Sequence, residues 1–490
     1  MTPDDVLARL RDLQSRDLPV HGGRTLAYVY DAGLPDVDRV AREAVAAFAG
    51  SNGLDPTAFP SLLAMENDLV GFTADLLDAP GGPDGVVGTI TSGGTESVLL
   101  AVQAARDAHR SAHPEVQAAM VLPDTAHAAF HKAAHYFDVE AVVVPTGADH
   151  RADVEATARV LDDLGDRTAL VVASAPSYAH GVVDPVTGLA ALAAARGTRC
   201  HVDACIGGWV LPYATRLGRA VPPWTFAVEG VTSISVDLHK YAYAPKGAAV
   251  LLHRSAALRK PQYFASAAWP GYTMLNSTTQ STRSGGPLAG AWAAVHAIGD
   301  TGYELLSRQV LAAVDAIVAA TTGIPGLSVV VAPDSTLVAL ATDDTCDPFT
   351  VADEMTTRGW HVQPQMSFGP HPATLHLSVS AATLPHVPEL VEALTAAVEA
   401  ARAAGPVAVD PDVVAFVAAL DPDALTDADF DGLLAASGLH GAGGPDAGLE
   451  LPTRMAPVNA LLDAAPPRLR EAVLVAFLDR LQRPTRGRAG

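Results

Sequence analysis

Lys240 is the residue whose surroundings most clearly favour covalent chemistry. It lies in the stretch SISVDLHKYAYAPKGAAVLLHR, residues 233–254, between an alternating apolar run and a second β-rich run at 248–252. This pattern predicts a lysine on a turn between two strands. We expect burial and cationic neighbours, including His239, to lower its proton affinity, as a Schiff-base lysine requires. An HK pair alone is more often an ordinary surface turn, so the interpretation depends on residues elsewhere.

Two further motifs place polar groups at predicted strand ends. In TSGGTESVLLAV a strand ends, Gly93 and Gly94 form a turn, and a helix begins at Thr95. The glycines let the backbone approach an anion, and the helix start supplies donors. In HVDACIGGWV a buried strand delivers Asp203 to its C-terminal end, where a carboxylate is costly unless it is paired. Taken singly, each motif also fits a simple cap or turn.

The order of these motifs predicts a pyridoxal phosphate site. An anion-binding turn, a strand-end aspartate and a lysine after a strand follow one another along the chain. The glycine turn would bind the phosphate. Asp203 would keep the pyridine nitrogen protonated, so that the ring acts as an electron sink, and Lys240 would form the Schiff base.

The elements around these motifs predict an α/β fold. Short β-branched runs alternate with helical stretches from Val86 to the strands around Lys240, which indicates a mostly parallel sheet with helices on both faces. Ligands of such sheets bind beyond the carboxyl ends of the strands. A smaller α+β unit follows. We expect four segments: an N-terminal arm (1–60), a large cofactor-binding domain (61–300), a small C-terminal domain (301–405), and an acidic Pro/Ala/Gly-rich extension with terminal helices (406–490).

Composition limits the partners. The chain has 490 residues and a net charge of -22, which argues against nucleic-acid binding because that requires a basic surface. The three cysteines, Cys200, Cys205 and Cys346, fit neither a disulfide framework nor a zinc pattern, so no metal is expected. No signal-peptide core or apolar run of about 18 residues is present. We expect a soluble, cytoplasmic protein without stable membrane insertion.

Beyond single motifs, the chain resembles the fold-type I, group II pyridoxal phosphate decarboxylase family, and within it the sphingosine-phosphate lyases most. The resemblance runs from about Gly23 to Leu481 through SNGLDPTAFPSLLAMEN, TSGGTESVLLA, TAHAAFHKAA, SAPSYAHGVVDP, HVDACIGGWVLP and SVDLHKYAYAPKG. It implies a fold-type I transferase-like architecture, a small-molecule amino substrate, pyridoxal 5'-phosphate as cofactor, and a homodimer with shared active sites.

The resemblance also assigns residues to the cofactor. His127, in TAHAAFHKAA, matches the family histidine that stacks on the cofactor ring, and His239 resembles a neighbour of the phosphate or of the lysine link. His180, in SYAHG, is similar to a histidine that lines the site. The predicted cofactor-binding set is Gly93, Gly94, Thr95, His127, Ser174, Asp203, Cys205, His239, Lys240 and Thr282.

On the substrate side, Lys246 is the discriminating residue. The lyases resemble APKG at this position, whereas glutamate decarboxylases resemble APLG, and a second cation can bind an anionic group. Tyr30 occupies the place of a lyase tyrosine near the substrate phosphate. The segment 272–286 resembles a loop that reaches into the partner's site, with Ser281, Thr282 and Arg283 as polar contacts. The predicted catalytic set is Lys240, His127, Lys246 and Tyr30.

One departure weakens the usual lyase substrate. The chain has SNGLD where lyases of phosphorylated sphingoid bases resemble SNPLH, so Asp55 replaces a histidine. A carboxylate repels a phosphate unless it points away. The favoured function is a carbon-carbon lyase that works by retro-aldol cleavage through an external aldimine. An amino-acid decarboxylase is the alternative, followed by an aminotransferase and a catalytically silent binding protein.

Overall fold

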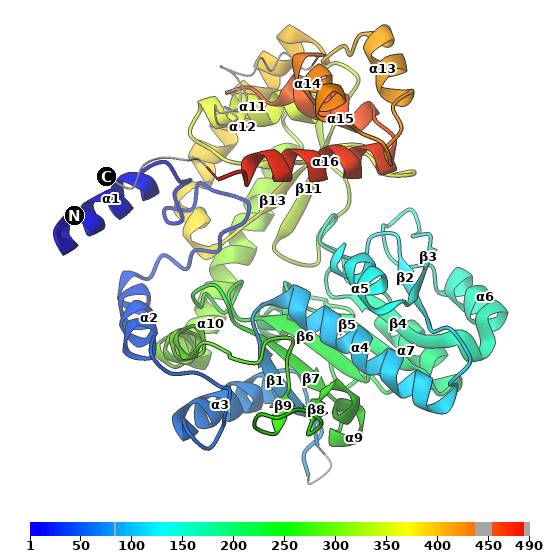
Figure 1. The fold of residues 1–490 in the computed structure, drawn as a ribbon. Helices are drawn as coiled ribbons and strands as arrows, with labels where there is room; N and C mark the ends of the chain where they lie inside the picture. Colours follow the sequence, from blue (N-terminus) through cyan, green and yellow to red (C-terminus); the bar gives the residue numbers. More distant parts are fainter. Residues whose placement is uncertain (83–84, 437–452, 485–490) are drawn as a thin grey trace.

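A seven-stranded sheet forms the centre of the larger unit. The computed structural model describes residues 1–82, 85–436 and 453–484. The strands lie in the order β1-β7-β6-β5-β4-β2-β3 (Figure 1). The strand β7 runs antiparallel to β1 and β6, and the other neighbours are parallel, which confirms the predicted mostly parallel sheet. The strands are β1 (Val87–Thr91), β2 (Ala119–Pro123), β3 (Glu140–Val144), β4 (Thr168–Ser174), β5 (Arg199–Asp203), β6 (Ser233–Asp237) and β7 (Ala249–His253).

Helices cover both faces of this sheet because the strands are apolar on both sides. Met120 and Leu122 of β2 pack in the cluster formed with α4 (Gly94–Ala112) and α5 (Ala129–Phe137). Val121, between them, belongs to the main core, on the side of α6 (Val154–Leu164), α7 (Val186–Ala195) and α8 (Leu211–Arg216). This alternation follows from the two-residue period of a strand.

The parallel strands bring the candidate residues to one edge. Ser174 ends β4 and pairs in register with Asp203, which ends β5, and Asp203 pairs with Ser235 of β6. Lys240 lies on the connection between β6 and β7, as expected. The site therefore lies at the carboxyl edge of the sheet.

A second, antiparallel sheet forms the smaller unit, in the order β10-β11-β13-β12. Its strands are β10 (Leu327–Val329), β11 (Leu337–Thr342), β12 (Gln363–Gln365) and β13 (Thr374–Ser378), and its helices are α11 (Pro348–Thr357) and α12 (Val387–Ala404). The long helix α10 (Gly285–Thr321) leads into this unit (Figure 1) and is kinked at Gly299, whose φ is 65°.

The N-terminal arm consists of helices joined by irregular segments. They are α1 (Pro3–Gln14), α2 (Pro35–Ala47) and α3 (Pro60–Leu76). The segment GRTLAYVYDAG contains no strand and makes a single bridge, from Thr25 to His361. The helix α1 buries none of its residues and lies to one side of the larger unit (Figure 1). The short helix α9 (Ala256–Arg259) and the hairpin of β8 (Phe264–Ser266) and β9 (Met274–Asn276) follow the main sheet.

The C-terminal extension is more helical than its composition indicated. It contains α13 (Pro411–Ala418) and α14 (Asp427–Ala436), which the sequence did not predict, and the expected α15 (Ala456–Ala464) and α16 (Pro467–Leu481). These helices share an apolar cluster that includes Val417, Leu433, Leu461 and Leu469. Residues 437–452 and 485–490 of the predicted extension lie outside the described part. No helix within the described ranges is long and apolar enough to cross a membrane.

Candidate active site

Lys240 faces a buried carboxylate that the sequence analysis did not assign. Its Nζ lies 2.9 Å from Oδ2 of Asp237, the last residue of β6. Asp237 is 2% exposed, and its Oδ1 has no hydrogen-bond partner among the described residues. His239 Nε2 lies 3.6 Å from the same Oδ2. The turn after β6 therefore presents an amine, an imidazole and a carboxylate to one small space.

This carboxylate reverses the expected protonation of Lys240. Burial is the largest single influence and opposes the ammonium charge, but the charge and hydrogen bond of Asp237, together with Cys205 and Tyr30, raise the pKa of Lys240 above its ordinary value. Our expectation of a lowered proton affinity was therefore wrong for the protein alone, because it considered only burial and cations. Burial, with the charges of Lys246 and Lys240, does lower the pKa of His239.

The glycine turn lies directly against this group. A Cβ added at Gly94 would come 2.6 Å from Cys205 Sγ and 2.9 Å from Asp237 Oδ2, and one at Gly93 would come 3.2 Å from His239 Cε1. The helix α4 begins at Gly94, with Gly93 as its N-cap. The absence of side chains thus lets the start of α4 pack directly against Cys205 and Asp237, and the backbone N–H groups at a helix start suit a phosphate.

Asp203 lies at the same edge, in a network of buried polar groups. It accepts hydrogen bonds from Cys205 N (3.1 Å) and Ser235 Oγ (3.4 Å). Burial alone would raise its pKa, but His127 and Lys240 hold the pKa of Asp203 below its ordinary value. An ionised carboxylate at this position can pair with a protonated ring nitrogen. His127 precedes α5, which begins at Ala129, and its Nδ1 accepts a hydrogen bond from Ala129 N.

Ser174 is held beside Asp203 by another carboxylate. Its backbone N donates to Asp184 Oδ2 at 2.7 Å. Asp184 is fully buried, and burial raises its pKa to about 6. These bonds fix the end of β4 next to the end of β5.

Tyr30 and Lys246 meet on the open side of the site. Lys246 Nζ lies 4.9 Å from the centre of the Tyr30 ring and donates to Tyr28 O at 2.9 Å. Tyr30 packs edge-on against Tyr241 at 5.0 Å. Burial raises the pKa of Tyr30 to about 12, although the charge of Lys240 opposes the rise. Burial and repulsion from Lys240 lower the pKa of Lys246 to about 8, while much of its side chain stays exposed.

Two predicted cofactor residues lie at the surface of the single chain. Thr95 and Thr282 are exposed. Arg283, a predicted contact for the partner's site, instead forms an ion pair with Glu66 at 2.9 Å. Glu96 links the two regions, because it accepts from Ser92 N and from Thr279 N. The loop that carries Thr282 is thus attached to the start of α4.

The sequence analysis missed Asp237 and Tyr178. Asp237 ends a buried strand three residues before Lys240, so it carries the same signal that singled out Asp203. Tyr178 stacks on His376 at 4.2 Å and lies edge-on to His127 at 6.4 Å. No pattern in the sequence indicates that pairing, because His376 belongs to the smaller unit.

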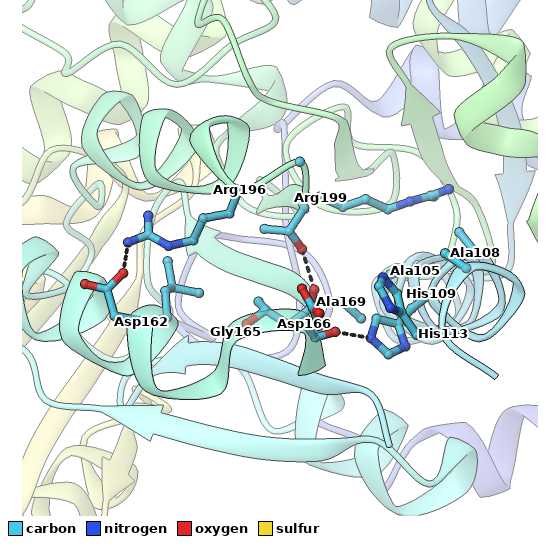
Figure 2. A pocket seen from close by; sticks show the side chains of 15 residues that line it. Ala105, Ala108, His109, His113, Asp162, Gly165, Asp166, Ala169, Arg196 and Arg199 are labelled. Carbon is cyan, nitrogen blue, oxygen red and sulfur yellow. Dashed lines mark hydrogen bonds and ion pairs between the residues drawn. The ribbon is translucent and has the colours of Figure 1, made fainter. Parts of the chain in front are cut away.

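Two cavities lie at opposite edges of the sheet. One, of about 310 Å³, is lined by residues that include His127, Tyr178, His180 and His371. A larger one, of about 440 Å³, is lined by His109, Asp166 and Arg199 (Figure 2). There His109 Nε2 lies 2.7 Å from Asp166 O. Because Arg199 begins β5, this larger cavity lies at the amino edge, away from Lys240.

The comparisons with known proteins agree with this geometry. Residues 26–268 match the model "Pyridoxal-dependent decarboxylase conserved domain", and residues 411–480 match "Pyridoxal-dependent enzyme, C-terminal putative HTH domain". A sphingosine-1-phosphate lyase of Arabidopsis thaliana is 36% identical over 403 residues, which are 81% of this chain and 72% of the relative. The chain belongs to the pyridoxal-dependent decarboxylase family. It is a pyridoxal phosphate-dependent lyase.

Of two further relatives, one is named a lyase and the other a decarboxylase. The structure of a Burkholderia pseudomallei sphingosine-1-phosphate lyase is 34% identical, with a TM-score of 0.77, and the match covers 82% of this chain and 92% of that one. A "Probable L-tyrosine/L-aspartate decarboxylase" of Methanothrix thermoacetophila is 31% identical over 366 residues, 74% of this chain and 88% of the relative. The likeness confirms the fold-type I architecture.

The residues present fit the cofactor. The N-terminus of α4 suits its phosphate, the ionised Asp203 suits its ring nitrogen, and Lys240 suits its aldehyde. The unpartnered Asp237 Oδ1 is a further polar atom aimed into this space.

Proposed function

We propose that this lyase cleaves a carbon-carbon bond in a phosphorylated long-chain amino alcohol, with release of an aldehyde. The observation that carries the proposal is the pair of Lys246 and Tyr30. It places an ammonium and a phenol beside Lys240, where they can receive the anionic group of a substrate whose amine reaches the cofactor. The relatives at 34% and 36% identity carry the name of sphingosine-1-phosphate lyases.

Each group has a separate task in this proposal. Bound pyridoxal phosphate supplies an electron sink for the bond that breaks. Asp203 would hold a negative charge at the ring nitrogen, and His127, which is close enough to lower the pKa of Asp203, would place its imidazole beside the ring. Tyr30 remains protonated at neutral pH because its pKa is about 12, so it can donate a hydrogen bond to a substrate oxygen.

Asp55 is engaged in its own loop. Its Oδ1 accepts hydrogen bonds from Thr57 N (2.8 Å) and Thr57 Oγ1 (2.6 Å), and these bonds lower its pKa. The side chain is exposed. An aspartate that caps its own turn at the surface is compatible with a phosphorylated substrate, and we keep that substrate class.

We propose a homodimer with shared sites as the working form. Tyr272 is 54% exposed and Leu275 is 64% exposed, on the segment that the resemblance directs toward a partner. Apolar side chains of this size are enriched at interfaces. Thr282 would then contact the cofactor of the partner, which agrees with its exposure in a single chain. Light scattering should give twice the chain mass, and the double variant Tyr272→Asp/Leu275→Asp should shift this mass toward the monomer.

The cytoplasmic location and the absence of a nucleic-acid partner remain predictions. The match of residues 411–480 to an HTH description makes the second one testable. The chain as a whole carries a net charge of -22, which opposes binding to a polyanion. We expect no retention of labelled duplex DNA at physiological salt.

A product assay distinguishes the two activities found among the relatives. The holoenzyme is incubated with a phosphorylated long-chain amino alcohol and, separately, with L-tyrosine, L-aspartate and L-glutamate. The proposal predicts aldehyde from the first and no carbon dioxide from the others. Carbon dioxide release without aldehyde would assign the decarboxylase activity, for which the Methanothrix relative provides the specific support.

A further inference from the structure

Three histidines from distant parts of the chain meet beside the smaller cavity. His150 lies in the loop between β3 and α6, His180 follows β4, and His371 lies between β12 and β13. One ring nitrogen from each lies within 4.8 Å of the other two. The ring centres of His371 lie 5.4 Å from His150 and 5.2 Å from His180.

The nitrogens of this cluster are free to bind a ligand. Nδ1 of His150 and Nδ1 of His180 are buried and have no hydrogen-bond partner in the described part of the chain. His180 is only 5% exposed.

Asp124 lies beside the third histidine. Its Oδ2 lies 3.3 Å from Nε2 of His371, without the geometry of a hydrogen bond. A carboxylate that accepts one ring N–H leaves the lone pair of the other nitrogen for an ion, and such pairs are a common outer partner of metal-bound histidine. The carboxylate also makes the cluster more favourable for a cation than for an anion.

We propose that His150, His180 and His371 bind a divalent transition-metal ion of the Zn²⁺ class, with Asp124 as the outer partner of His371. Nitrogens bound to one tetrahedral Zn²⁺ lie about 3.4 Å apart, since Zn–N bonds are ~2.0–2.1 Å. The distances between the three ring nitrogens, now up to 4.8 Å, must therefore shorten. The rings of His150 and His180, whose centres lie 4.0 Å apart in a stack, must turn apart. Rotation of side chains provides these movements without a change in the sheet.

The position of the cluster gives the ion a structural task. It would join the loop after β3, the segment after β4 and the β12–β13 connection, and so tie the smaller unit to the carboxyl edge of the large sheet. His180 and His371 line the same cavity as His127 and Tyr178. The cysteine pattern did not indicate this site because its ligands are histidines far apart in the sequence.

Metal binding can be measured directly on the full-length holoenzyme. The protein, free of any affinity tag and treated with chelator, is equilibrated with Zn²⁺, and bound zinc is counted by mass spectrometry. We expect one tight equivalent and a rise in melting temperature. His371→Gln and His150→Gln should each lose the tight equivalent, and Asp124→Asn should weaken it by roughly 10- to 100-fold. His135→Gln, on the exposed side of α5, is the matched control and should bind as the wild type does.

Two results would overturn the proposal. One is a wild-type protein that takes up no tight zinc, and the other is uptake that is equal in the histidine variants and the control. Cofactor absorbance and the melting temperature without zinc show whether each variant is folded. If both histidine variants fail to fold, X-ray absorption on the zinc-loaded wild type decides, because scattering from three imidazoles is required and its absence refutes the site. None of these measurements depends on which substrate the lyase cleaves.

Discussion

Replacing Gly94 by alanine tests whether the turn before α4 receives the cofactor phosphate. The added Cβ would lie 2.6 Å from Cys205 Sγ and 2.9 Å from Asp237 Oδ2, whereas unstrained contacts are ~3.5–4.0 Å. The neighbours must therefore move by about 1 Å, and such overpacking costs about 1–3 kcal/mol. When this cost falls on the cofactor-bound state, it weakens cofactor binding roughly 5- to 150-fold.

The assay is a titration of the apoprotein with pyridoxal phosphate, followed by absorbance, together with thermal unfolding without cofactor. Gly71→Ala is the matched control, because Gly71 lies on the exposed side of α3 and an added Cβ meets nothing within 4 Å. We expect it to leave cofactor affinity unchanged and to stabilise the protein by up to ~1 kcal/mol. If Gly94→Ala binds the cofactor as tightly as Gly71→Ala does, the turn is not the phosphate site.

Three further variants test other parts of the site. Asp237→Asn removes a charge that raises the pKa of Lys240 and leaves a buried ammonium without this partner, so urea unfolding of the apoprotein should show a loss of about 3–5 kcal/mol. An unchanged midpoint would contradict this. Lys246→Gln should raise the KM of a phosphorylated substrate about tenfold. The wild-type KM should also rise above pH 8, because the pKa of Lys246 is about 8 and its ammonium charge is lost above that pH. A KM that stays constant from pH 7 to pH 9 would refute the role of Lys246. Asp463→Asn removes the carboxylate that accepts hydrogen bonds from Ser367 N (2.6 Å) and Ser367 Oγ (2.8 Å) and so holds the β12–β13 connection. We expect the KM to rise and the cofactor affinity to stay unchanged. Asp479→Asn, on exposed α16, is the control and should alter neither quantity.

Much of the fold was predictable because its signals are local. Alternating β-branched and helical runs predicted the parallel sheet, and the apolar runs on both sides of Lys240 predicted its turn. The helices α13 and α14 were missed because their composition resembles that of a loop, and they are stabilised by packing on α15 and α16. Tertiary packing of this kind overrides local propensity.

The candidate site was predictable where strand ends brought residues together. Gly94, Asp203 and Lys240 lie at one edge because parallel strands end there. The pKa of Lys240 was predicted in the wrong direction, since it depends on one buried carboxylate, Asp237, whose distance no sequence pattern gives. The group of His150, His180 and His371 was also invisible, because its members come from three separate loops.

The most direct test of the account is to find where the cofactor is attached. The holoenzyme is reduced with borohydride and digested, and the pyridoxyl-modified peptide is located by mass spectrometry; the lyase assay is then repeated on Lys240→Ala. The account predicts modification of Lys240 and loss of aldehyde release in the variant. Modification of Lys246 or of another lysine, or an active Lys240→Ala protein, would contradict it.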